Sequence, residues 1–118
     1  MTTISSHILD STTGRDAGGI RVICHRLLAS GQAQSVFDKK ADDNGRISVD
    51  IDRSDDSADA RYELILCSGD YFVSTQGAMV AESAITEVVV RIDLAHAKEH
   101  FHVPVLIAPH NHTLWWSR

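Results

Sequence analysis

Hydrophobic residues recur in short runs along this chain, and clusters of turn-forming residues separate the runs. Short apolar runs between turn signals are typical of β-strands, whereas a helix would repeat its apolar residues every three to four positions. The pattern predicts eight strands, over residues 4–10, 19–28, 34–40, 46–51, 61–67, 86–94, 101–108 and 112–117.

Three segments between the predicted strands are rich in turn-forming residues. They are residues 13–16, which read Thr-Gly-Arg-Asp, residues 43–45, which read Asp-Asn-Gly, and the acidic, serine-rich run 53–59. Asn44 and Gly45 both tolerate a positive φ, so this pair predicts a tight hairpin. The run 53–59 is interpreted as a solvated loop.

One segment departs from the strand pattern. Residues 69–77 follow two possible helix caps, Ser68 and Asp70, and they finish at Gly77. This arrangement predicts one or two helical turns that end at the glycine. Eight strands about 8–12 residues apart, with one short helix, indicate an all-β sandwich or barrel.

Length and composition fit one folded domain over residues 1–118, with 43% hydrophobic and 23% charged residues. A net charge of -5 argues against nucleic acid or an anionic membrane surface as partner, since both require clustered cations. No apolar run has the length of a signal peptide or a membrane span, so we expect a cytoplasmic protein. Cys24 and Cys67 lie in apolar runs and are expected to be buried, reduced thiols.

The seven histidines are the first candidates for chemistry. Residues two apart share one face of a strand, so His100 and His102 project together, as do His110 and His112 on the next strand. Histidine serves as a general base, a proton shuttle or a metal ligand near neutral pH. A hydrogen-bonded structural histidine is the alternative for each of them, and we favour it for His110 and His112.

Neither a metal nor another cofactor is expected, because no compact metal motif is present. A zinc site built from His7, His100 and His102 remains an alternative, provided that the first strand lies beside the strand 101–108. Arg46 follows the turn at residues 44–45. There it is either a solvated arginine or a planar donor for a carboxylate or an imide oxygen.

Six motifs carry a family resemblance. They are SSHILDSTTGR (5–15), DDNGR (42–46), YELIL (62–66), GDYF (69–72), EVVVRI (87–92) and EHFHVPVLIAP (99–109). In order and spacing they are similar to the 5-hydroxyisourate hydrolases, so from about residue 4 onward the chain resembles the transthyretin and 5-hydroxyisourate hydrolase family. The resemblance implies a transthyretin-like sandwich of two four-stranded sheets with one short helix. It also implies a homotetramer with paired sites in a central channel.

The resemblance assigns roles to four side chains. His7 matches the histidine of the family's first strand, Arg46 the arginine after the turn, and His102 the histidine before Val-Pro, so these three are the expected catalytic residues. His100 matches a further channel histidine and is expected to bind substrate. The implied reaction is hydrolysis of 5-hydroxyisourate or a related small cyclic amide. His7 and His102 would hold the water and move its proton, and Arg46 would bind the oxyanion or an anionic substrate.

The chain departs from the family near residue 118. Where the hydrolases usually read Tyr-Arg-Gly-Ser, this chain has Trp115, Trp116, Ser117 and Arg118. In an extended strand Thr113, Trp115 and Ser117 share the face that the family turns toward its channel, so we expect them to bind substrate, with Trp115 narrowing the pocket. Alternatively, the two tryptophans seal a subunit interface.

This departure leaves two other functions open. One is a non-catalytic carrier of small ligands that resembles transthyretin. The other is a paralogue that uses the same acid–base pair for cyclisation, isomerisation or decarboxylation. The retained histidines and arginine favour the hydrolase, because a carrier has no evident use for all of them. His110 and His112 replace aromatic residues common in the family and are expected to point away from the channel face.

Overall fold

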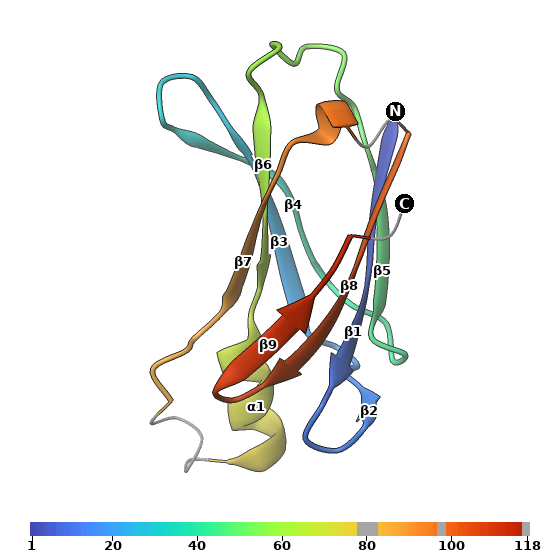
Figure 1. The fold of residues 1–118 in the computed structure, drawn as a ribbon, viewed down its shortest axis with the longest axis vertical. Helices are drawn as coiled ribbons and strands as arrows, with labels where there is room; N and C mark the ends of the chain where they lie inside the picture. The colour runs from blue at the N-terminus through green and yellow to red at the C-terminus, as the bar shows by residue number, and fades with distance from the viewer. Residues whose placement is uncertain (78–82, 97–98, 117–118) are drawn as a thin grey trace.

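Two β-sheets pack face to face in the computed structural model, which describes residues 1–77, 83–96 and 99–116 (Figure 1). Sheet A contains β1 (Thr2–Asp10), β2 (Arg15–Asp16), β5 (Arg46–Ile51), β8 (His100–Ala108) and β9 (Asn111–Leu114). Sheet B contains β3 (Arg21–Leu27), β4 (Ala33–Lys40), β6 (Arg61–Leu66) and β7 (Val88–Ile92). The helices are α1 (Ser68–Gln76) and the short 3-10 helix η2 (Leu94–His96).

Strand β1 lies inside sheet A between β5 and β8. It pairs with β8 in parallel, in an unbroken register from Thr3 beside His100 to Asp10 beside Ile107. On its other side it pairs antiparallel with β5, where His7 lies opposite Arg46. The two-residue β2 pairs with the last part of β1, and β9 lies beyond β8. In sheet B the order is β4-β3-β6-β7, with antiparallel pairs throughout.

The core forms between the two sheets because alternate residues of each strand point inward. In β1 and β8 the inward side chains include Ile4, Ile8, Val103 and Val105, all nearly inaccessible to solvent. Sheet B contributes the facing layer, and its largest fully buried side chains are Tyr62, Leu64, Leu66, Val22 and Val88. The alternate residues of sheet A point outward and take no part in this core.

The predicted sandwich of two sheets with one short helix is confirmed, but sheet A has five strands where four were predicted. Each predicted strand is present; β5 has the predicted ends, and the ends of the other strands are shifted. One strand was not predicted: β2 lies within the segment 13–16 that we expected to be only a turn. The strand expected from residue 19 begins at Arg21, because Gly19 has a left-handed φ of 76° that interrupts an extended backbone. Of the segment 86–94, only β7 is a strand, and the 3-10 helix η2 begins at Leu94.

The turn at residues 42–45 is not the predicted hairpin, because it joins β4 of sheet B to β5 of sheet A. The Asp42 carboxylate holds it by accepting the backbone N–H groups of Asn44 and Arg46, both at 2.9 Å. Gly45 has a φ of 70°, and its carbonyl accepts the N–H of Ile8 at 2.8 Å. The turn therefore anchors the start of β5 against β1.

Helix α1 covers one end of the sandwich (Figure 1), and its Phe72 is 1% exposed. The predicted caps were wrong at the N-terminus: Cys67 is the N-cap residue and makes no side-chain capping bond, while Ser68 and Asp70 lie inside the helix. The predicted end at Gly77 is confirmed, with a φ of 86°.

The predicted state of the thiols is also confirmed, since Cys24 and Cys67 are both free and buried. Among the described residues, no helix combines the length and the apolar character that crossing a bilayer requires.

Replacing Gly45 with alanine is expected to lower the free energy of unfolding more than replacing Gly14, which has a similar φ of 75°. A Cβ at Gly14 meets nothing within 4 Å. Gly14→Ala should therefore lower the free energy of unfolding only by the strain of a left-handed φ, about 1–2 kcal/mol. A Cβ at Gly45 would lie 2.3 Å from the Ile8 carbonyl oxygen and would displace β1. Urea denaturation of both variants measures the difference, and equal losses would contradict the proposed anchoring role.

Candidate active site

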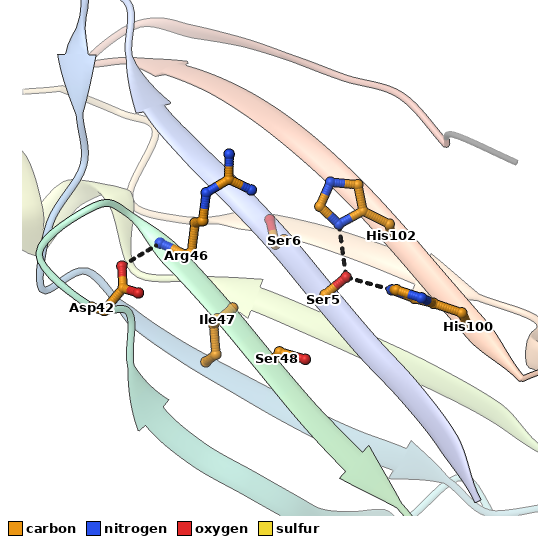
Figure 2. A pocket seen from close by; sticks show the side chains of 8 residues that line it. All are labelled: Ser5, Ser6, Asp42, Arg46, Ile47, Ser48, His100 and His102. Atoms are coloured by element: carbon orange, nitrogen blue, oxygen red, sulfur yellow. Dashed lines mark hydrogen bonds between the residues drawn. The ribbon is translucent and has the colours of Figure 1, made fainter.

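A cavity of about 440 Å³ opens on the outward face of sheet A (Figure 2). Strands β1, β5 and β8 and the turn before β5 supply its walls. The lining residues are Ser5, Ser6, Asp42, Arg46, Ile47, Ser48, His100 and His102. Seven of these eight residues have polar side chains, so the cavity offers several hydrogen-bonding groups to a small ligand.

The strand register brings these residues together from three distant parts of the chain. Ser5 of β1 is the partner of His102 in β8 and of Ser48 in β5. Two residues further along β1, on the same face, His7 is the partner of Arg46. His7, Arg46 and His102 therefore share the outward face of one sheet, as the predicted site requires.

Ser5 joins the two histidines of β8. Its Oγ lies 2.7 Å from Nδ1 of His102 and 2.8 Å from Nε2 of His100. The two imidazole rings stand edge to face, with centroids 6.2 Å apart. Ser5 is 8% exposed, whereas His100 is open to solvent. One buried hydroxyl thus fixes one nitrogen of each ring and leaves Nε2 of His102 as the ring atom available to a ligand.

Arg46 stands at the start of β5 and projects from the same face as His102 (Figure 2). Its backbone N–H is held by Asp42, as described above. Within the described part of the chain its guanidinium forms no ion pair and no side-chain hydrogen bond. A planar, exposed cation without a carboxylate partner is suited to bind an anion or a carbonyl oxygen that gains negative charge.

His7 is oriented by a carboxylate. Its Nε2 lies 2.9 Å from Oδ1 of Asp16, which stands in the short strand β2. Its side chain lies beside the cavity and is not among the lining residues. Asp16 therefore occupies one ring nitrogen of His7 and leaves Nδ1 for other contacts.

The surroundings of His102 disfavour its charged form. Burial lowers the pKa of its imidazole, and the nearby positive charge of His100, Arg46 and His7 lowers the pKa further. A histidine whose pKa lies below its usual value of about 6.5 is neutral at pH 7 and can accept a proton. Of the three predicted catalytic residues, His102 best fits the role of a general base.

The zinc alternative gains no support from the geometry. No group of three potential ligands is close enough to hold a metal in the described residues. Nε2 of His7 contacts Asp16, and the two histidines of β8 both contact Ser5, so these rings do not converge on one point.

The predicted substrate-binding residues near residue 118 lie apart from the cavity. Thr113 pairs with Leu106 on the outward face, and the backbone N–H of Trp115 donates to the carbonyl of Pro104 at 3.3 Å. Neither side chain lines the cavity, and Ser117 falls outside the described residues. Trp116 points inward and stacks on Phe101 with centroids 6.1 Å apart.

His112 pairs with the inward-facing Ile107, so it lies on the face opposite Thr113, as expected, and His110 lies in the turn before β9. Both are therefore separated from the cavity.

Sequence reasoning missed three residues of the site: Ser5, Asp16 and Asp42. Ser5 precedes His7 by two positions and so shares its face, but its contacts depend on which strand lies alongside β1. Asp42 begins an Asp-Asp-Asn-Gly segment, and its side chain forms the backbone-directed bonds that aspartate favours in turns. No local signal marks Asp16.

Comparison with known proteins gives consistent results. The family model described as HIUase/Transthyretin matches residues 4–116. The 5-hydroxyisourate hydrolase of Caulobacter vibrioides is 31% identical over 117 residues, which cover 98% of this chain and 97% of that protein. The solved structure of Klebsiella pneumoniae 5-hydroxyisourate hydrolase is 28% identical, has a TM-score of 0.78 and covers 100% of both chains.

A sea bream transthyretin solved in complex with thyroxine shares the fold alone. It is 18% identical, with a TM-score of 0.79 over 97% of this chain and 93% of that one. The likeness first seen in six short motifs thus extends through the whole sandwich, and this chain belongs to the HIUase/transthyretin family.

Proposed function

We propose that this protein is a hydrolase that opens the ring of 5-hydroxyisourate or a closely related small cyclic amide. The observation that carries the proposal is the joint placement in one cavity of a proton-accepting imidazole, His102, and the guanidinium of Arg46, which pairs with no carboxylate among the described residues. Relatives that match nearly the whole chain are named 5-hydroxyisourate hydrolases, which supports the choice of substrate.

His102 acts as the general base in this proposal. Because Ser5 engages Nδ1, Nε2 takes the proton from a water molecule while the water oxygen adds to the acyl carbon of the substrate. The same nitrogen then returns the proton to the ring nitrogen that leaves as the carbon–nitrogen bond breaks. The water is consumed, and the imidazole ends the cycle neutral.

Arg46 stabilises the negative charge that develops on the carbonyl oxygen. A donor already in place at that oxygen is worth about 10²–10³-fold in rate, because it needs no rearrangement during the reaction. His7, oriented by Asp16 on the same sheet face, contacts the substrate or the water from the side opposite His100. His100, which lines the cavity, is the further substrate-binding residue of this proposal. Substrate binding by Thr113, Trp115 and Ser117 stays a prediction, since the first two do not line the cavity and Ser117 is outside the described residues.

The carrier alternative has one observation in its favour. Trp115 is 46% exposed, and alternation along β9 places it on the same sheet face as the cavity. An aromatic side chain there would suit an aromatic ligand that is bound and not turned over. Stoichiometric binding of such a ligand with quenching of tryptophan fluorescence, in a protein without turnover, would favour the carrier.

The active form proposed is a cytoplasmic homotetramer. The outer edges of β7 and β9 pair with no further strand among the described residues, and Val89, Trp115 and Trp116 near them are 51%, 46% and 42% exposed. Unpaired edges with exposed apolar side chains favour contacts with further subunits. Two free, buried thiols accord with a reducing compartment.

His102→Gln and Arg46→Lys are expected to slow the decay of freshly generated 5-hydroxyisourate, followed by its ultraviolet absorbance. Loss of the base should cost about 10²–10⁴-fold in kcat/KM. Loss of the guanidinium fork should cost about 10²–10³-fold. Arg21→Lys, which changes an exposed arginine paired with Asp38 in sheet B, is the matched control and should retain the rate. If the unaltered protein does not accelerate the decay over buffer, the proposed substrate is wrong.

The pH dependence of kcat/KM should follow the lowered pKa of His102. A base whose pKa lies below the usual value of about 6.5 stays neutral to lower pH, so the rate should stay level near pH 7 and fall through a pKa below 6.5. His100→Gln removes one of the positive neighbours that lower this pKa, and the acid limb should move to higher pH. His25→Gln in sheet B serves as the control. An acid limb that the His100 substitution does not move would contradict the assignment.

Light scattering coupled to size-exclusion chromatography should give four times the 13.0 kDa mass of the chain. The expectation follows from the free strand edges and the exposed tryptophans described above. A mass that corresponds to one chain at micromolar concentration would overturn the proposed tetramer, and it would leave the residues of the cavity unaffected.

A further inference from the structure

We propose that Ser5 is a positioning residue that holds His102 in the Nδ1–H tautomer. In this arrangement Nδ1–H of His102 donates to Ser5 Oγ, and the Ser5 hydroxyl donates its own proton to Nε2 of His100. The catalytic meaning of this assignment rests on the proposed hydrolase function. The tautomer itself is a property of the protein without substrate.

The count of protons limits the arrangements. A serine hydroxyl has one proton to donate and two lone pairs, and a neutral imidazole carries a proton on one of its two nitrogens. Ser5 Oγ lies within hydrogen-bond distance of one nitrogen from each ring, at 2.7 and 2.8 Å. The two facing nitrogens therefore cannot both lack a proton. If Ser5 donates to one ring, it accepts from the other, and the tautomers of His100 and His102 become linked.

The charges around the cavity select the direction of this chain of hydrogen bonds. The second nitrogen of His102 is directed to the side of the cavity from which Arg46 projects (Figure 2). A guanidinium has donors only, so it favours a lone pair on a facing atom over an N–H group. Besides burial, the positive charge of His100, Arg46 and His7 lowers the pKa of His102, because it opposes a further positive charge on that ring.

The acidic groups nearby do not reverse this preference. Asp16, on β2, is engaged by His7, and Oδ1 of Asp42 accepts backbone N–H groups in the turn before β5. His100 is exposed, so water can satisfy its remaining nitrogen in either tautomer. Ser5 is the buried member of these three residues, so its hydroxyl is the group that needs both hydrogen bonds within the protein.

The arrangement prepares the base before substrate arrives. With a proton on Nδ1, the lone pair of His102 is on Nε2, which faces the cavity. When a water O–H bond breaks and its proton forms a new bond to Nε2, the imidazolium keeps its Nδ1–H bond to Ser5, so neither ring has to turn. In the opposite tautomer Nε2 would carry a hydrogen, and His102 could not accept the proton.

Long-range 1H–15N correlation spectra of the intact, 15N-labelled protein test the tautomer directly. His102 should show the Nδ1–H pattern at neutral pH, and Ser5→Ala should shift it toward the Nε2–H form. Ser5→Thr keeps the hydroxyl and should restore the original pattern. Ser11→Ala is the matched control, because the Ser11 hydroxyl also bonds to a partner in β8, the Ile107 carbonyl at 3.0 Å, and Ser11 does not line the cavity. An Nε2–H pattern in the unaltered protein, or no shift in Ser5→Ala, would overturn the proposal.

Kinetics separate this proposal from the proposed function. Ser5→Ala should lower kcat/KM about tenfold, less than the roughly 10²–10⁴-fold contribution of the whole base, and Ser5→Thr should recover most of it. A protein without hydrolase activity in which the tautomer responds as described would contradict the function and retain the role of Ser5. Full activity in Ser5→Ala with an unchanged tautomer would retain the hydrolase function and contradict the role of Ser5. The spectrum of the unaltered protein decides the tautomer even if Ser5→Ala folds poorly.

Discussion

The parallel pairing of β1 with β8 is the interaction on which the site depends. It aligns Ser5 with His102 and Thr3 with His100, pairs that are almost a hundred positions apart in the chain. Parallel strands cannot be joined by a tight turn, and closing so long a loop costs conformational entropy before any contact forms. The two imidazoles and the hydroxyl between them therefore meet only when sheet A is complete, so the chemistry of the cavity is tied to the whole fold and to no local motif.

A second constraint sets the position of the arginine. The turn before β5 crosses from one sheet to the other, and Gly45 lies so close to the Ile8 carbonyl that a side chain at this position would separate the two strands. The backbone bonds to Asp42 fix the last peptide of the turn, which is that of Arg46. Backbone geometry thus brings Arg46 opposite His7, and no carboxylate of the described residues pairs with its guanidinium, so the cation stays available to a ligand.

Features set by the local sequence were predicted correctly more often than features set by the tertiary structure. Strands and the helix end at Gly77 follow from local patterns, so they were predictable. The supposed hairpin at residues 44–45 was wrong because a turn sequence does not say to which sheet the next strand belongs. His7, Arg46 and His102 were named through a family resemblance, and composition alone would not have distinguished them from structural histidines and a solvated arginine. Ser5 escaped notice because its partners are set by strand register, which no local pattern encodes.

The alternation of β1 links stability to chemistry. Its even positions, such as Ile4 and Ile8, are buried between the sheets, while Ser5 and His7 face outward. A slip of one residue would expose the apolar set and bury the polar one, so the register that the core requires is also the register that assembles the site. Outward positions can then change with little effect on the core. The transthyretin at 18% identity shares this sandwich, and a shared fold does not determine what the outward face binds.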